Sequence, residues 1–270
     1  MVRKRMLLSV MVVGMFCSAS FALAPMGPPM AGPQQGQYGV GIGYAQSDMT
    51  LEVSGPDWNH GGEMVINDLQ NNLYFICLGY GVSNDWELYG GIGMAGAEFP
   101  GDTGAPDFEG DNGFAFGIGT KRTLVEDGDT KWGILGQYTR GKSEDSVRVP
   151  SIGESGYPTW GNGAVDLDVS GKAEAKLEWY EVQVAIGPTV PLSEDVCIYG
   201  GPFLHFAEAD LELKDAEGYR CEHELEQKLE LGAYIGTLIS LGDPNASLMA
   251  EFLYTGNGWA WGVGAMFKCP

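Results

Sequence analysis

Basic residues, histidines and long apolar runs are all scarce in this sequence. Of its 270 residues, 15 are Lys or Arg, against 36 Asp or Glu. Because Lys and Arg bind the phosphate backbone, this balance excludes nucleic acid as a partner. No stretch of about 18 apolar residues follows the N-terminal segment, so we predict no transmembrane helix. Three His and five Cys, with no CxxC or Cys/His cluster, give no metal or cofactor motif.

The N-terminus has the three parts of a secretory signal peptide. Basic residues lie in Met1–Arg5, an apolar run reaches Phe16, and small residues follow. The apolar run is shorter than the about 20 residues that a membrane-spanning helix needs. Pro25 hinders cleavage just before it, so we expect cleavage after Ala22 and assign residues 1–22 to the signal peptide. Without the three basic residues of this segment, 12 Lys and Arg remain.

Glycine and alanine alternate with bulky apolar residues in four segments. In 37–45 (QYGVGIGYA) the bulky residues share one face of a strand and the small ones the other, because strand side chains alternate. The alternation returns in 88–97, 114–120 and 259–267. It favours a closed sheet whose bulky face meets lipid and whose thin face lines a narrow interior. On this basis Ile42→Arg should disturb assembly by about 2–4 kcal/mol, and Gly43→Ser should be far milder.

The pattern predicts an all-β chain that forms a closed antiparallel transmembrane β-barrel of about ten strands. Residues 23–36 form a Pro/Gly-rich N-terminal linker, and residues 37–270 form the barrel. Eight strands result if weak segments are loops, and twelve if Val147–Val149 and Ala164–Val169 form a hairpin. We expect the ten strands at 37–53, 69–82, 85–99, 112–125, 130–144, 171–188, 195–213, 222–240, 247–255 and 258–268.

The lengths of the connections give the barrel a direction. Connections after the second, fourth, sixth and eighth strands are short, and those after the first, third, fifth and seventh are longer. Outer-membrane barrels have short periplasmic turns and longer external loops, so both termini are placed in the periplasm. The acids concentrate at these external loops, as in Glu98–Asp111 and Glu208–Glu226. Outward aromatic residues fall near two rims, and Trp259 and Phe267 lie roughly 20 Å apart along one tilted strand.

On these features the chain resembles the small outer-membrane β-barrels, the OmpA/OmpX and opacity-type superfamily, without a periplasmic domain. The resemblance covers about 37–268 and rests on the signal peptide, the Gly/aromatic alternation and the closing strand Trp259–Phe267. It implies a Gram-negative outer membrane, lipid as the main partner, and insertion by the barrel-insertion machinery through that closing strand. Family members commonly end on an aromatic residue, whereas three residues follow Phe267 here.

The inward face is expected to carry polar side chains. Two neighbouring pairs stand out, Glu87 with Lys121 near the periplasmic end and His205 with Glu230 near the outer end. Charges in a narrow lumen need partners, so a network that plugs the barrel is the first interpretation. A cation-preferring pore lined by carboxylates stays open as the second. The candidate interior residues are Glu87, Lys121, Gln137, Glu181, Gln183, His205, Glu230 and Glu251.

The function predicted from the sequence is a structural or surface-interaction role with acidic external loops. The alternative is a narrow porin or ligand-binding barrel for small cationic solutes, followed by a surface hydrolase and a soluble secreted β-barrel. Outer-membrane hydrolases resemble this barrel, but His60, His205 and His223 match no catalytic motif, so no catalytic residue is assigned. Divalent cations are considered at the acidic loop 102–112. Disulfide pairing among Cys77, Cys197, Cys221 and Cys269 stays open.

Overall fold

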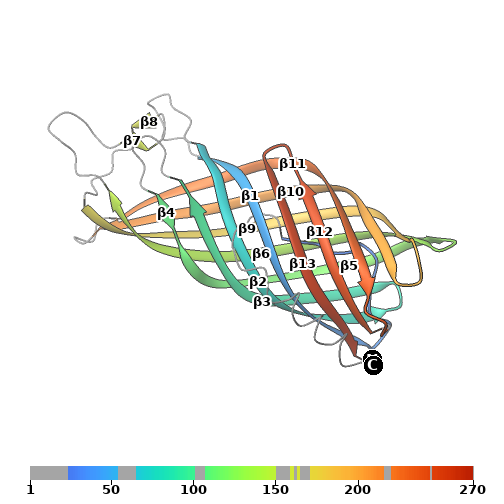
Figure 1. Ribbon diagram of the computed structural model, residues 1–270. Helices are drawn as coiled ribbons and strands as arrows, with labels where there is room; N and C mark the ends of the chain where they lie inside the picture. The colour runs from blue at the N-terminus through green and yellow to red at the C-terminus, as the bar shows by residue number, and fades with distance from the viewer. Residues whose placement is uncertain are drawn as a thin grey trace.

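Ten long antiparallel strands close into a barrel in the computed structural model (Figure 1). The structure describes residues 24–53, 65–100, 107–149, 159–160, 163–164, 171–215, 220–243 and 245–269. The ring strands are β1 (Tyr38–Val53), β2 (Val65–Ser83), β3 (Trp86–Phe99), β5 (Asp111–Asp127), β6 (Thr130–Val149), β9 (Gly171–Pro191), β10 (Val196–Asp215), β11 (Arg220–Ser240), β12 (Ala246–Tyr254) and β13 (Gly258–Cys269). Pairing of β13 with β1 closes the ring. Across these residues no helix is long and apolar enough to cross a membrane.

The fold class and the ten strands predicted from the sequence are confirmed. Three further short strands lie outside the ring, β4 (Phe108–Glu109) beside β3, and β7 (Thr159–Trp160) paired with β8 (Gly163–Ala164). The twelve-strand alternative is wrong for Val147–Val149, which ends β6 and pairs with β9. The predicted signal peptide, residues 1–22, lies outside the described residues.

Strand β9 shows that the polarity of the wall reverses along the barrel. In its outer part the inward residues are Ala173, Ala175, Leu177 and Trp179, all buried, and they alternate with outward Glu174, Lys176 and Glu178. Beyond Tyr180 the order inverts, with Glu181 and Gln183 buried inside and Val182, Val184 and Ile186 exposed outside. An apolar exterior over a polar interior is the lipid-spanning arrangement, and a polar exterior over an apolar interior suits water. Tyr180 therefore lies at the outer surface of the membrane.

An aromatic row follows this boundary across four neighbouring strands. Phe116, Tyr138, Tyr180 and Phe206 lie with successive ring centroids 6.1 Å apart. A second group marks the periplasmic rim, where Tyr38, Tyr80, Trp86, Trp132 and Phe267 are each at least 40% exposed. Tyr and Trp gather at both surfaces of a bilayer, because their rings are apolar and their tips polar. Between the two groups, large apolar side chains such as Ile42, Ile92 and Leu231 remain exposed to lipid.

The part of the barrel beyond the aromatic row, which we call the outer extension, is narrower than the membrane part. The hairpin β12–β13 is short, and above it β1 pairs directly with β11 through Glu52–Glu226 and Val53–Leu225. Two of the ten strands thus leave the wall, and among the described residues eight remain. An eight-stranded barrel is just wide enough for side chains to fill its interior. Here the filling is apolar, including Leu51, Leu69, Phe99, Phe108, Leu177, Leu211, Leu213 and Leu225.

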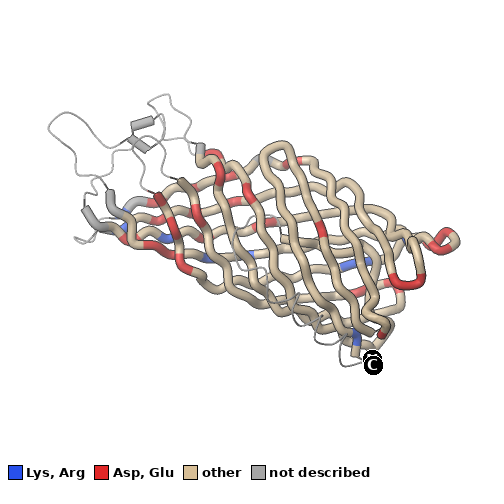
Figure 2. The backbone as a smooth tube through the Cα atoms, in the orientation of Figure 1, with Lys and Arg blue, Asp and Glu red and all other residues tan. Residues whose placement is uncertain are grey.

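Acidic residues gather at the outer extension, away from the C-terminus, as Figure 2 shows. The sequence predicts that acids gather at an external loop within Glu208–Glu226, between strands at 195–213 and 222–240. The two strands are confirmed, but most of these acids lie on them rather than in the connection. Residues 208–215 continue β10 and residues 220–226 begin β11. The acids alternate with inward Leu211, Leu213 and Leu225, because the strands continue beyond the membrane into water.

Candidate functional site

The N-terminal segment 24–36, expected to be a linker from its Pro/Gly composition, runs inside the barrel over residues 24–33 and is exposed at 34–36. Glu251 of β12 accepts hydrogen bonds from the backbone N–H groups of Met26 (2.7 Å) and Gly27 (2.8 Å). Glu87 of β3 accepts one from Gly32 at 2.9 Å. Buried carboxylates thus satisfy backbone donors of a segment that has no secondary structure of its own.

Glycines on the inner face of the wall make room for this segment. A Cβ placed on Gly262 would lie 2.1 Å from Pro25 Cγ, and one on Gly133 would lie 2.4 Å from the Pro29 carbonyl oxygen. Such distances are far below van der Waals contact, so no larger residue fits without displacement. The small face noticed in the sequence is therefore the surface against which the N-terminal segment packs.

Other inward glycines lie beneath aromatic rings. A Cβ on Gly43 would be 2.3 Å from Cζ of Phe75 on the neighbouring strand, and one on Gly119 would be 2.3 Å from Cζ of Tyr89. The outer edges of these rings therefore occupy the space that glycine leaves open.

Seven of the eight candidate interior residues are buried, each less than 9% exposed; they are Glu87, Lys121, Gln137, Glu181, Gln183, His205 and Glu251. They come from six strands of the membrane part and surround the N-terminal segment. Glu230 differs, because it is half-buried and binds Asn257 in the turn between β12 and β13.

The polar side chains inside the barrel do not form the two pairs expected from the sequence. His205 and Glu230 are register partners on β10 and β11, but His205 Nε2 lies 3.4 Å from Glu181 Oε2 on β9. Glu181 also accepts a hydrogen bond from the Ala24 N–H. Glu87 and Lys121 are likewise register partners, yet the described residues show no ion pair between them. Side chains in a lumen lean across strands and toward its contents, which strand register alone does not reveal.

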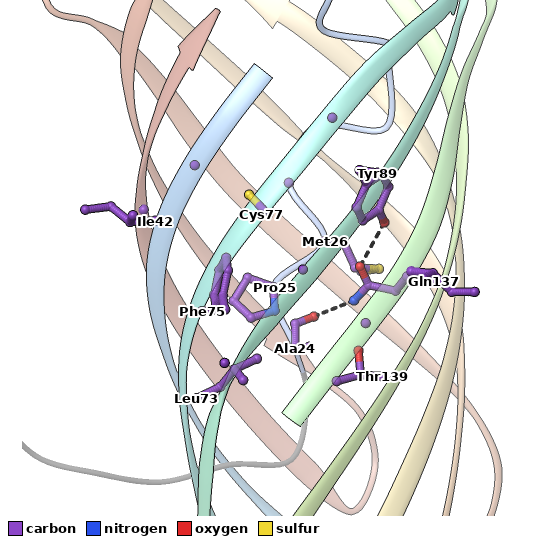
Figure 3. Close-up of a pocket in the computed structure, with 18 of the residues that line it drawn as sticks. Ala24, Pro25, Met26, Ile42, Leu73, Phe75, Cys77, Tyr89, Gln137 and Thr139 are labelled. Atoms are coloured by element: carbon purple, nitrogen blue, oxygen red, sulfur yellow. Dashed lines mark hydrogen bonds between the residues drawn. The ribbon is translucent and has the colours of Figure 1, made fainter. Parts of the chain in front are cut away.

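A cavity of about 120 Å³ lies between the N-terminal segment and the wall formed by β1, β2, β3, β5, β6, β12 and β13 (Figure 3). Phe75, Leu73 and Pro25 face it on one side, and Tyr89 and Gln137 on the other. Tyr89 donates a hydrogen bond to Gln137 Oε1 (2.9 Å), and Gln137 Nε2 donates to the Ala24 carbonyl (2.9 Å). Lys121 completes the lining with its ammonium 5.1 Å from the Tyr89 ring centroid.

Tyr89 and the N-terminal backbone belong to this site but were not among the sequence candidates. The alternation of inward and outward side chains could have identified Tyr89, since it faces inward two residues from Glu87 and opposite Gly119. The segment 24–36 offered no such signal, because its residues have no strand or helix period.

The described residues contain no group of three His, Cys, Asp or Glu placed to hold a metal ion. In the acidic loop considered for divalent cations, Phe108 and Glu109 form β4, and 101–106 lie outside the described residues. Cys77, Cys197 and Cys269 are free thiols. His223 is half-buried in the outer extension, where burial lowers its pKa, and His60 lies outside the described residues.

Glu251→Ala should loosen the N-terminal segment without unfolding the barrel. The substitution removes the acceptor of two buried hydrogen bonds, and bonds to charged groups contribute about 1.5–3 kcal/mol each. We therefore expect amide hydrogen exchange at Met26 and Gly27 to become at least about tenfold faster in lipid nanodiscs. Glu230→Ala is the matched control, because Glu230 does not touch the segment, and it should leave exchange there unchanged. Equal protection in Glu251→Ala and the parent protein would contradict the role given to Glu251.

Solved structures share this fold at low sequence identity. The outer membrane protease OmpT from Escherichia coli aligns over 88% of this chain and 98% of its own, with 11% identity and a TM-score of 0.51. The translocator domain of the autotransporter NalP from Neisseria meningitidis aligns over 98% and 94%, with 13% identity and a TM-score of 0.45. Ail of Yersinia pestis aligns over 87% and 100%, with 14% identity and a TM-score of 0.35. No family model and no curated protein matches the sequence.

At these identities the likeness concerns the fold and does not fix an activity. The membrane location follows from the chain's own surface, an exposed apolar belt between two groups of aromatic residues. Open sheets cannot cross lipid, whereas a closed ring pairs every strand. The chain thus has the fold of a transmembrane β-barrel, as the outer-membrane proteins above do.

Proposed function

We propose that this barrel conducts no ions and acts through its outer extension, in a structural or surface-interaction role. The observation that carries the proposal is that the lumen is filled at two levels. The N-terminal segment occupies the membrane part, held by Glu251 and Glu87. An apolar core of buried leucines and aromatic residues fills the outer extension above it. A water path would have to pass both, and an apolar core excludes ions.

The charge on the outer extension favours cationic partners. Glu208, Asp210 and Glu212 face outward along β10, next to Glu178 of β9 and Glu222 of β11. Burial, together with the neighbouring Glu208, Glu178 and Glu222 carboxylates, raises the pKa of Asp210. Arg140 pairs with Glu178 at 2.8 Å and Arg220 with Glu212 at 3.0 Å, which neutralises only part of the surface. Basic peptides and divalent cations would relieve the remaining repulsion.

Electrical recording tests the closed lumen. Purified protein in planar bilayers should give no conductance steps above background, because both fillings must be displaced before ions pass. Steady steps from the wild-type protein would overturn the proposal and restore the pore as the leading function.

A binding measurement tests the outer extension. In nanodiscs, the protein should bind an oligolysine peptide more strongly than empty nanodiscs do, and the excess should fall as salt rises. A triple variant with Glu208→Gln, Asp210→Asn and Glu212→Gln should weaken binding severalfold. A control with Glu126→Gln and Asp127→Asn, at the periplasmic end of β5, should not. Binding equal to that of empty nanodiscs would refute the surface-interaction role.

A hydrolase has less support than this role. His205 is 0% exposed and binds Glu181 inside the membrane part, so its ring cannot reach a substrate at the surface. Secretion by cleavage after Ala22 and insertion through the strand Trp259–Phe267 remain part of the proposal, drawn from the sequence and the resemblance.

A further inference from the structure

Lys121 is the one charged side chain facing the luminal cavity whose ammonium has no hydrogen-bond acceptor among the described residues. It is 7% exposed and stands 5.1 Å from the Tyr89 ring centroid. A cation–π contact leaves its three N–H donors without acceptors. Within a membrane-spanning segment, such a buried cation is costly and points to a functional site.

The buried carboxylates nearby already have partners. Glu251 binds Met26 and Gly27, and Glu87 binds Gly32. Glu181 binds His205 and Ala24. An added cation beside Lys121 would be repelled by its ammonium, the charged group that lacks a partner. An added anion would be repelled, because the three buried carboxylates already outnumber the one lysine and the one histidine near them. The group that fits beside Lys121 is an uncharged oxygen acceptor.

The rest of the cavity is apolar and flat-walled. Leu73, Phe75, Met26 and Met249 line it together with glycines of the wall. Its volume of about 120 Å³ approaches that of an engineered cavity of about 150 Å³ that binds benzene. The Cζ edge of the Phe75 ring lies over Gly43, and aromatic rings pair favourably with one another and with methionine sulfur.

From these features we propose that the cavity binds a small uncharged aromatic molecule with one oxygen acceptor, of the phenol class. The ring lies among Phe75, Leu73 and Met26, and the oxygen accepts a hydrogen bond from the Lys121 ammonium. This goes beyond the proposed outer function and is independent of it, since the ligand binds inside a barrel that does not conduct.

Cys77 provides a reporter, because its thiol lines the same cavity (Figure 3). The protein in nanodiscs is treated with methyl methanethiosulfonate, and modification of each cysteine is followed by peptide mass spectrometry. Phenol should slow modification of Cys77 at least about fivefold at saturation. Cys197 and Cys269, which do not line the cavity, should react at unchanged rates and so control for effects of phenol on the reagent or the lipid.

Two comparisons test whether the oxygen of the ligand accepts a hydrogen bond from Lys121. Toluene, which has the ring but no oxygen, and benzoate, which carries a charge, should both protect Cys77 less than phenol does. In Lys121→Met, which keeps an unbranched side chain one atom shorter and removes the ammonium, half-protection should need at least about tenfold more phenol, because a hydrogen bond from a charged donor is lost.

Equal protection by phenol and toluene, or an unchanged phenol requirement in Lys121→Met, would refute the assignment to Lys121. Stronger protection of Cys77 by benzoate than by phenol would mean that the cavity prefers an anion to a neutral molecule, and it would overturn the proposal. No protection by any of the three would exclude the cavity as a binding site. If Lys121→Met fails to fold, as judged by heat-modifiable gel mobility, the three-ligand comparison on the parent protein decides alone.

Discussion

Ile42→Arg should destabilise the assembled barrel by about 2–4 kcal/mol, the cost of a charge on the lipid face near the membrane midplane. Ile42 is 49% exposed on β1 between Gly41 and Gly43, midway between the two aromatic groups. No neighbouring side chain shields it, so an arginine there must meet hydrocarbon or bend toward the surface. The free energy of unfolding in lipid vesicles, from urea titration with gel mobility as a second probe, measures the effect.

Gly43→Ser should also be damaging, contrary to what the sequence alone predicts. The residue faces inward as expected, but the position of its Cβ lies 2.3 Å from the Phe75 ring. We expect about 1–3 kcal/mol of destabilisation from overpacking. Phe75→Leu removes the ring, so the serine should cost markedly less in the double variant.

The Phe75→Leu background separates overpacking inside the barrel from the cost of a charge on the lipid face. Combining Phe75→Leu with Ile42→Arg should give no such relief, since Ile42 faces lipid and does not touch the ring. If Ile42→Arg were tolerated as well as the conservative Ile42→Leu, the assignment of faces or the membrane location itself would be wrong.

Period-two alternation was sufficient to predict the wall of this barrel. Strand side chains alternate by geometry, so Glu181 and Gln183 could be placed inside and Val182 outside from the sequence. Loop lengths then gave the direction, because short turns and long loops lie on opposite sides of the membrane.

The contents of the lumen could not be predicted in the same way. The segment 24–36 is rich in proline and glycine, and its position depends on a few hydrogen bonds that its backbone N–H groups donate to Glu251 and Glu87. Such bonds leave no periodic trace in a sequence. The partner of His205 was missed for a related reason, since its side chain reaches across to Glu181 rather than to its register partner Glu230.

The outer extension could not be recognised from the sequence, because its side chains alternate between an apolar inner face and a polar outer face, as in a soluble sheet. Leu211 and Leu213 alternate with Asp210 and Glu212, and an acidic composition suggested loops. The pattern that distinguishes this segment is the change of sign at Phe206 and Tyr180, where polar residues move from the inner to the outer face. A reversal of polarity along one strand predicts where a barrel wall leaves the membrane.

Leu211→Ala should destabilise the outer extension by about 2–5 kcal/mol, the cost of a cavity in a tightly packed core. Leu211 is 0% exposed and lies among Leu177, Leu213 and Leu225. Its neighbour Asp210 faces water, so Asp210→Ala should change stability by less than about 0.5 kcal/mol. Leu204→Ala, on the lipid face of the same strand, should cost less than Leu211→Ala because it leaves no internal cavity.

Hydrogen exchange should show where the damage falls. In Leu211→Ala, amides of β10 beyond Phe206 and the paired amides of β11 should lose protection, while those of the membrane part keep it. An apolar core in water is stabilised by the hydrophobic effect, whereas the lipid-spanning part depends on its closed ring of backbone hydrogen bonds. Equal costs for Leu211→Ala and Asp210→Ala would mean that the outer extension has no packed interior, and the closed lumen would then depend on the N-terminal segment alone.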